Sequence, residues 1–131
     1  MKKNISIELF EKIIFSICDD TTTQNQEGWT KGNPLWGHCA VISLLAQDIF
    51  GGELLRGDLT KISGFEHMRS HYWNLLPDGT EMDFTRSQFG EYPPNLLREI
   101  RRRDYVLSYP ETAKRYKEIV RRFYEHIKKL T

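Results

Sequence analysis

The chain of 131 residues carries 19 basic and 18 acidic side chains, and 39% of its residues are hydrophobic. Its length allows one domain with one principal core, and the composition is ordinary for a soluble globular protein. No stretch approaches the roughly 20 apolar residues of a membrane span, and the N-terminal residues lack the pattern of a secretory signal. The two cysteines, Cys18 and Cys39, do not suggest a disulfide framework. We therefore expect a cytoplasmic protein that does not enter membranes.

The net charge of +1 is unevenly distributed along the chain. Residues 1–90 hold 8 basic and 12 acidic side chains, whereas residues 91–131 hold 11 and 6. A basic region of this kind is able to bind nucleic acid. The sequence favours the alternative, a solvated helix face, because apolar residues recur in this region at helical spacing. These apolar residues are Tyr116, Ile119, Val120, Phe123 and Ile127.

In chain order, the first predicted element is an amphipathic helix over residues 6–18, with Ser6 as its N-cap. The polar, turn-rich segment DDTTTQNQEGWTKGNP predicts a loop. Residues 39–50 predict a second helix, which ends at the glycine pair 51–52. This second helix is apolar nearly all round, so we expect it in the middle of the fold.

The elements that follow are predicted to be strands and then helices. The segment ELLRGDLT has the character of a short strand, and RSHYWNLLPDGTEMDFT predicts a hairpin of two strands around a turn. Two consecutive prolines separate this hairpin from a predicted helix near residues 95–103 and a longer one near 111–129. The pattern therefore predicts helices and strands in one α+β fold.

Cys39 stands where a Pro- and Gly-rich loop becomes the second helix. A thiol at a helix N-terminus lies near unpaired N–H groups and the positive end of the helix dipole, which favour the thiolate. Gly37 lets the backbone approach closely at this turn. Free cysteines are most often inert core residues, and this is our interpretation of Cys18. For Cys39 to be reactive, a base must lie beside it.

The turn of the hairpin determines which residues of its two strands face each other. Pro77 suits the first position of a type I turn, and Gly79 then takes the left-handed position of a three-residue loop with a bulge. This loop pairs Leu76 with Thr80. A two-residue Asp-Gly turn would shift the pairing by one residue, but Pro77 before Asp-Gly favours the longer loop.

With the three-residue loop, the hairpin brings a histidine and a carboxylate together. Trp73 then faces Asp83 across the two strands, and His71 is a diagonal neighbour of Asp83 on the same sheet face. The two-residue turn would place Asp83 on the opposite face. Asp83 is therefore predicted to orient His71, and His71 to act as the base for Cys39.

Several segments resemble known families. GHCAVISLLAQDIFGGELLRG resembles the nucleophile segment of transglutaminase-like proteins, in which Gly-x-Cys opens a helix, and HYWNLLPDGTEMDFT resembles their hairpin with His, Trp and Asp. The order Cys, His, Asp is that of the papain-like superfamily. More closely, NPLWGHC, QDIFGGE, HYWN and DFTRSQF together resemble the small, uncharacterised bacterial YunG-like family, over about residues 5–92.

The resemblance implies roles for individual residues. Cys39 would be the nucleophile, His71 the base and Asp83 the group that orients the base. Papain-like peptidases have a glutamine six positions before the cysteine that donates to the oxyanion, and here that position is Asn33. Because Asn33 precedes a proline, it is equally well interpreted as a turn residue. Trp73, on the sheet face of the histidine, is expected to support the site.

The resemblance also implies the fold class. We expect an α+β fold with a minimal papain-like core, in which the central nucleophile helix packs on a small antiparallel sheet. Residues 1–131 are expected to form a single domain, with a core over about 5–92 and a C-terminal helical extension over about 93–131. Papain-like peptidases usually have a second lobe, for which this chain has little room. A narrow acyl-transfer, deamidation or amidase reaction therefore fits better than broad proteolysis.

We expect a cysteine-dependent hydrolase or acyltransferase that acts on an amide or thioester carbonyl through an acyl-enzyme, with proteins among the candidate substrates. The alternative is a non-catalytic binding module of the same fold. Such a module would bind nucleic acid or protein through the basic C-terminal helices or through loop aromatics such as Trp29, Trp36 and Tyr92. Salt-sensitive binding to nucleic acid would favour it.

A zinc site made of Cys39, His71 and Asp83 is a third interpretation, because these residues offer S, N and O ligands. No close-spaced Cys-x-x-Cys or His-x-x-x-His pair supports it. We therefore expect no metal and no cofactor.

Overall fold

The computed structural model describes residues 4–94 and 96–130, and these form an α+β fold with a small antiparallel sheet, as expected. In chain order, the helices and strands are α1 (Ile7–Ile17), α2 (Cys39–Phe50), β1 (Glu53–Asp58), β2 (Ser70–Leu75), β3 (Glu81–Met82), β4 (Arg98–Arg101), α3 (Arg103–Leu107) and α4 (Pro110–Lys129). Short 3₁₀ turns lie at Glu66–Met68 and Arg86–Gln88.

α1 begins at the predicted N-cap. The Ser6 hydroxyl accepts a hydrogen bond from the Leu9 N–H at 3.1 Å, which satisfies one of the unpaired donors of the first helical turn. Glu8 in the first turn is favourable to the helix dipole. The apolar face of α1 is buried, and its buried residues are Phe10, Ile13, Ile14 and Ile17.

α2 is the buried central helix that the sequence predicts, and it starts at Cys39 itself. Its end also follows the prediction, because Gly51 and Gly52 both have positive φ, at 80° and 83°. A Cβ at Gly52 would overlap the carbonyl of Leu75. Glycine is therefore required where the chain turns from α2 into β1.

The sheet has the strand order β3-β2-β1-β4, and every neighbouring pair is antiparallel. β2 is buried on both of its faces. On one face, Asn74 donates to the carbonyl of Ser43 in α2 at 3.0 Å. On the other face, the ring of His71 contacts the ring of Phe89, at 4.8 Å between centroids. The segment after β3 therefore packs against the sheet face that carries His71, and its Phe84 ring also stacks on Phe50 of α2.

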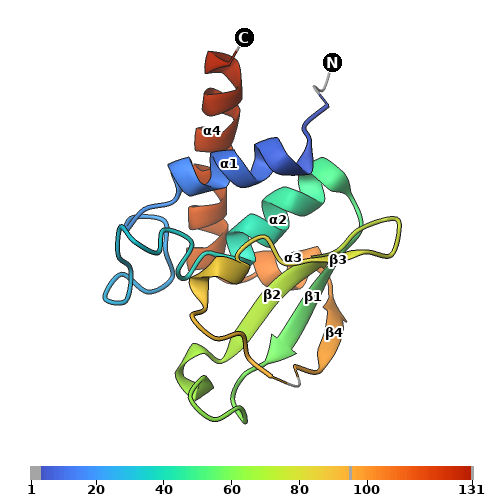
Figure 1. Ribbon diagram of the computed structural model, residues 1–131. Helices are drawn as coiled ribbons and strands as arrows, with labels where there is room; N and C mark the ends of the chain where they lie inside the picture. Colours follow the sequence, from blue (N-terminus) through green and yellow to red (C-terminus); the bar gives the residue numbers. More distant parts are fainter. Residues whose placement is uncertain (1–3, 95, 131) are drawn as a thin grey trace.

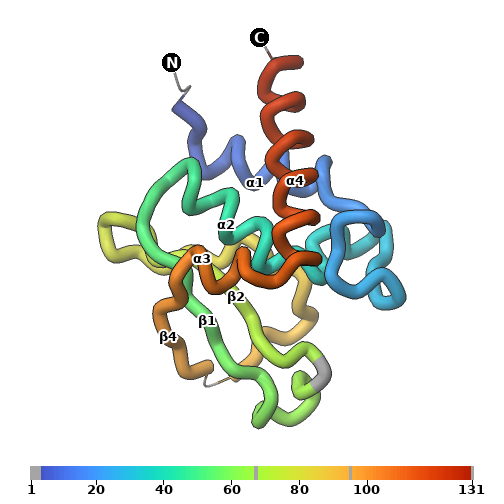
Figure 2. Tube along the Cα trace, turned by 180° about the vertical axis from the view of Figure 1, so that it is seen from behind, coloured from blue at the N-terminus to red at the C-terminus, as the bar shows by residue number. Residues whose placement is uncertain are grey.

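Two apolar clusters lie on the two sides of α2. The larger joins α1, α2 and α4, with Ile119 and Phe123 of α4 fully buried in it. The smaller lies towards the sheet and includes Leu44 of α2 and Tyr72 of β2. Figures 1 and 2 show the corresponding layers, with α2 between the sheet and the pair formed by α1 and α4. The region after residue 92 thus contributes to the core as well as to the surface.

One predicted helix, near residues 95–103, is wrong. Residue 95 lies outside the described residues, and Arg98–Arg101 form the edge strand β4, which pairs with β1. Leu, Glu and Arg favour helices locally, but the open edge of β1 offers backbone hydrogen bonds to this segment. The opposite residues Arg56 and Glu99, 43 positions apart in the chain, also form an ion pair across the two strands. The helix that follows, α3, is short, and the predicted helix near 111–129 is confirmed as α4.

None of the helices within residues 4–94 and 96–130 is both long enough and apolar enough to cross a bilayer. The longest of them, α4, carries charged side chains along its exposed face. Its apolar stripe packs into the larger core cluster through Ile119 and Phe123, with Tyr116, Val120 and Ile127 at the margin. The predicted amphipathic character of this helix is therefore confirmed.

Candidate active site

The turn between β2 and β3 has the predicted three-residue form. The Leu76 N–H donates to the Thr80 carbonyl at 2.8 Å, and the Gly79 N–H donates to the Leu76 carbonyl at 2.9 Å. Gly79 has a φ of 90°, the left-handed conformation that the loop requires. Leu75 pairs with Glu81 in the same register. This register places the histidine of β2 and the aspartate after β3 on one face.

His71 and Asp83 are in direct contact. His71 Nε2 lies 2.5 Å from Asp83 Oδ2, and the His71 side chain is almost completely buried. The same carboxylate oxygen accepts a hydrogen bond from the Tyr92 hydroxyl at 2.6 Å. Asp83 Oδ1 accepts from the backbone N–H of Thr85 at 3.2 Å. Donors on both oxygens fix the carboxylate, which in turn fixes the imidazole ring.

Three aromatic rings surround the imidazole of His71. Trp73 stacks on it, with 5.6 Å between centroids and 19° between planes. Phe89 and Tyr92 both approach edge to face, at 4.8 and 6.1 Å. These contacts restrict the rotation of the imidazole and exclude water from the His71–Asp83 pair. The structure thus places Trp73 beside the histidine, and its role in supporting the site stays a prediction.

The pKa of His71 is raised to about 9. Burial alone would lower it, but the hydrogen bond to Asp83 and the interaction with the Cys39 thiol more than offset burial. Nε2 is occupied by Asp83, whereas the buried Nδ1 has no hydrogen-bond partner of normal geometry among the residues that the structure describes. Nδ1 is therefore the ring nitrogen left for the thiol.

Cys39 is the first residue of α2 and is 7% exposed. Backbone N–H groups in the first turn of a helix have no partner within the helix, so they are available to a negative charge at this position. The side chain belongs to the apolar cluster on the sheet side of α2, with Leu54, Tyr72 and Val106. Because the Cys39 thiol is nearly buried, only groups of small cross-section are able to reach it.

Cys18, the other thiol, has a different environment. It follows the last residue of α1 and is 5% exposed in the larger core cluster. Burial raises the pKa of the Cys18 thiol, and the neighbouring charge of Asp19 acts in the same direction. A thiol with a raised pKa is a poor nucleophile at neutral pH. The interpretation of Cys18 as a core residue is therefore confirmed.

Asn33 occupies a turn. Its N–H donates to the Thr30 carbonyl at 3.0 Å, and its side-chain amide donates to the backbone carbonyl of Gln88 at 2.9 Å. The interpretation as a turn residue is thus confirmed. One of its two side-chain amide hydrogens is used by the Gln88 carbonyl. A role of Asn33 at the oxyanion stays a prediction.

Sequence reasoning missed two residues that organise the site. Gln88 is buried, accepts from the Gly37 N–H at 3.2 Å and donates to the Thr85 hydroxyl at 2.9 Å, so it joins the segment before Cys39 to the segment after Asp83. Tyr92 was expected only as one of several loop aromatics. No periodic pattern marks either residue, since Gln88 ends a single 3₁₀ turn and Tyr92 lies in irregular chain, both between β3 and β4.

His38 stabilises the loop that leads to Cys39. It is fully buried, with Nδ1 at 2.9 Å from the Trp36 carbonyl and Nε2 at 2.7 Å from the Thr22 hydroxyl. Burial lowers the pKa of His38 to about 4. A neutral ring then donates from Nδ1 to the carbonyl and accepts from the threonine hydroxyl at Nε2. Both nitrogens are used, so His38 holds the loop rather than serving as the base.

Metal ligation was the third interpretation of the sequence. Within the described part of the chain, no group of three or more His, Cys, Asp or Glu side chains is arranged to hold a metal ion. Asp83 instead directs its oxygens to His71, Tyr92 and Thr85.

Comparisons with known proteins bear on the identity of the chain. No curated protein and no solved structure gives a match. The family model described as YunG protein matches residues 6–128, which is nearly the whole chain. This match extends well past residue 92, where the resemblance of the individual motifs ends. The chain therefore belongs to the YunG family.

Proposed function

We propose that Cys39, His71 and Asp83 are the nucleophile, base and orienting residue of a cysteine-dependent hydrolase or acyltransferase. The observation that carries the proposal is the His71 imidazole, held at Nε2 by Asp83 at 2.5 Å and with Nδ1 left for the Cys39 thiol. Its raised pKa keeps the ring protonated at neutral pH. A buried imidazolium beside a thiol favours a thiolate–imidazolium pair.

The reaction follows from these positions. The Cys39 sulfur attacks an amide or thioester carbonyl, and a C–S bond forms as the carbonyl oxygen becomes an oxyanion. Backbone N–H groups at the start of α2 stabilise this oxyanion. His71 gives its proton to the leaving amine or thiol as the old bond breaks. His71 then takes a proton from water or an acceptor amine, which attacks the thioester and restores the free thiol.

The scaffold that we propose is a minimal papain-like core, with the nucleophile at the start of the central helix and the base on the adjoining sheet. The chain order Cys, His, Asp and the packing of α2 against β2 support this placement. Because Cys39 is only 7% exposed, we favour small or extended acyl groups over bulky substrates.

Alkylation of Cys39 by iodoacetamide as a function of pH tests the proposal. We expect fast labelling that persists well below pH 8, whereas an ordinary thiol loses reactivity below its pKa of about 8.5. The experiment uses a Cys18→Ala background, in which Cys39 is the sole thiol. Adding Cys39→Ala should abolish labelling and thereby identify the site.

Two further variants test the base. His71→Asn should slow labelling at pH 7 by about tenfold or more, because the imidazolium is lost. Asp83→Asn should slow it less, since a neutral amide is still able to accept from Nε2. Labelling that follows an ordinary thiol and ignores His71 would contradict the proposal and favour the non-catalytic binding module. A circular dichroism spectrum of each variant checks that it is folded.

A further inference from the structure

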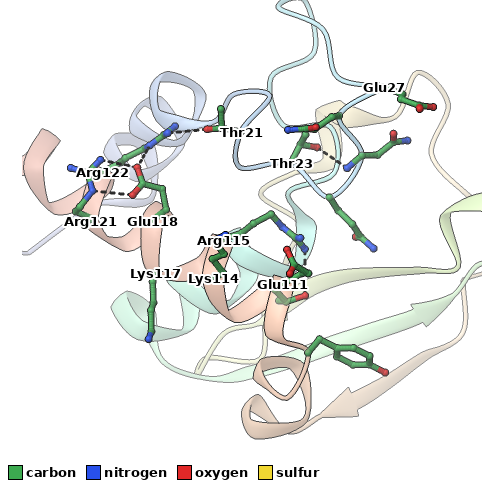
Figure 3. A pocket seen from close by; sticks show the side chains of 15 residues that line it. Thr21, Thr23, Glu27, Glu111, Lys114, Arg115, Lys117, Glu118, Arg121 and Arg122 are labelled. Atoms are coloured by element: carbon green, nitrogen blue, oxygen red, sulfur yellow. Dashed lines mark hydrogen bonds and ion pairs between the residues drawn. The ribbon is translucent and has the colours of Figure 1, made fainter.

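A groove of about 1170 Å³ lies between residues 109–122, at the start of α4, and the polar loop over residues 21–27. Figure 3 shows this groove with the side chains that line it. Threonine, glutamine and asparagine side chains form the loop wall, and charged side chains of α4 form the other. A polar, charged hollow of this kind suits a hydrophilic ligand rather than an apolar one.

The loop wall is fixed directly to the residues that precede Cys39. The Thr23 hydroxyl donates to the Trp36 carbonyl at 2.5 Å, and the Gln24 N–H donates to the Gly37 carbonyl at 3.0 Å. A Cβ at Gly37 would overlap the Thr23 hydroxyl, so the two segments pack without a gap. The loop wall of the groove is therefore attached to the segment that leads into α2.

The charges lining the groove have a basic excess, with five basic and three acidic side chains. At one end, Glu118 is neutralised by Arg121 and Arg122, at 2.7 and 2.6 Å. Nearer the start of α4, neither Lys114 nor Arg115 forms an ion pair with a described residue, because the ion pairs of this helix are made by Arg121 and Arg122. Two cations are thus available at that end of the groove.

Arg115 differs from the other cations of the groove in having a buried donor that lacks a partner within the described part of the chain. Its Nε is buried without a hydrogen-bond partner among the described residues, and Nη2 makes one long contact, 3.4 Å to the Thr112 hydroxyl. Figure 3 shows the side chain extending along the groove towards Glu111. Burial lowers the pKa of Arg115, and the charges of Glu111 and Cys39 oppose that effect, so the guanidinium also lies within electrostatic range of the nucleophile.

We propose that this groove binds an anionic group, a carboxylate or a phosphate, of the substrate whose carbonyl reacts at Cys39, with Arg115 as the main contact. The inference rests on the proposed function and narrows its substrate class. A guanidinium presents several donors in a planar fork that matches the oxygens of both groups. Lys114 adds charge, and the amides and hydroxyls of the loop wall are available to the remaining oxygens.

A pair of small reagents tests the link to Cys39. Iodoacetate and iodoacetamide both alkylate a thiolate with loss of iodide, but only iodoacetate is anionic. In the Cys18→Ala background, Arg115→Gln should reduce the ratio of the iodoacetate rate to the iodoacetamide rate by about fivefold, because a nearby positive charge is lost. High salt should reduce the same ratio in the parent protein.

Matched variants control for folding and for net charge. Arg102→Gln removes the same charge from a side chain that is 85% exposed and outside the groove, and it should leave the ratio unchanged. Arg115→Lys retains the charge and should restore most of the ratio. Should Arg115→Gln fail to fold, the exposed Lys114→Gln should still lower the ratio, by a smaller factor.

Direct binding is measured independently of the thiol by titrating the ¹⁵N-labelled protein with inorganic phosphate and with succinate. Shifts in residues 21–27 and the first half of α4 are expected, and Arg115→Gln should abolish them. Binding of one anion alone would identify phosphate or carboxylate as the ligand group. Preferential binding of a single-stranded oligonucleotide would assign the groove to nucleic acid and overturn the inference.

The outcomes separate the two proposals. An unchanged reagent ratio in Arg115→Gln, with fast labelling that depends on His71, overturns the inference and leaves the proposed function standing. Slow labelling by both reagents overturns the proposed function. Anion binding that depends on Arg115 would then show an anion site that does not serve Cys39, which also overturns the inference as stated.

Discussion

Asp83 receives hydrogen bonds at both oxygens, from His71 and Tyr92 at Oδ2 and from Thr85 at Oδ1. A carboxylate with these partners cannot rotate without breaking several of them. It therefore sets both the orientation and the charge of the imidazole. These two effects are separable, because an amide in place of the carboxylate keeps an acceptor oxygen but removes the negative charge.

Asp83→Asn should bring the pKa of His71 down from about 9 towards its ordinary value. The imidazolium loses the adjacent charge that opposes the effect of burial, while Nε2 keeps a neutral acceptor. NMR titration of the imidazole carbons in histidine-labelled protein measures this pKa directly. Tyr92→Phe, which leaves the carboxylate in place, is the control and should keep the pKa raised. A His71 titration that is the same in Asp83→Asn and the parent would show that the carboxylate does not set the charge of the ring.

The sequence was sufficient to place His71 beside Asp83, and it was insufficient for the residues around them. The placement of His71 beside Asp83 depends on the alternation of side chains along the strands and on the turn that Pro77 and Gly79 favour, and both features are local in the sequence. Gln88 and Tyr92 act through contacts between irregular segments. Asn33 and Gln88 are 55 residues apart. No local rule predicts such contacts.

At the scale of elements, α1 shows how far local rules extend. Its N-cap and its first residue follow the sequence pattern, because capping satisfies donors within the same turn. β4 shows the opposite case. Arg98–Arg101 lie in a segment with good helix formers, but pairing with β1 satisfies backbone groups that the edge of the sheet would otherwise leave to water. Backbone hydrogen bonds to β1 therefore outweigh the local helix preference of this segment.

The cap of α1 provides a quantitative test. Ser6→Ala should lower the free energy of unfolding by about 1 kcal/mol, because the Leu9 N–H loses its acceptor. Urea denaturation followed by circular dichroism measures the difference. Ser16→Ala is the control on the same helix. Ser16 is exposed and makes only a 3.5 Å contact to the Lys12 carbonyl, so its replacement should be close to neutral. Equal losses for both variants would rule out a specific contribution of the cap.

At the scale of the whole molecule, two buried histidines with opposite preferences lie beside Cys39. His38 precedes it in the chain and favours the neutral form, because burial lowers its pKa to about 4. His71 favours the protonated form, because Asp83 and Cys39 outweigh burial and raise its pKa to about 9. Each histidine therefore links the stability of the fold to pH, and the two links have opposite signs.

We expect the free energy of unfolding to be greatest near pH 6.5 and to fall on both sides. The His71 contribution is fully present below about pH 6.5, the ordinary value in the unfolded chain, and is lost as the pH rises through about 9. The His38 contribution is fully present above about pH 6.5 and is lost as the pH falls through about 4. Each change amounts to at most a few kcal/mol.

Urea denaturation at a series of pH values from about 4 to 9 measures the fall in the free energy of unfolding below about pH 6.5, the acid limb, and above it, the alkaline limb. Asp83→Asn should flatten the alkaline limb alone, because it removes the main interaction that favours protonated His71. His38→Gln should flatten the acid limb alone, since a glutamine does not titrate. A decline above neutral pH that persists in Asp83→Asn would mean that groups other than His71 control the alkaline stability. The stability of the fold would then give no evidence that His71 and Asp83 form a charged pair beside the Cys39 thiol.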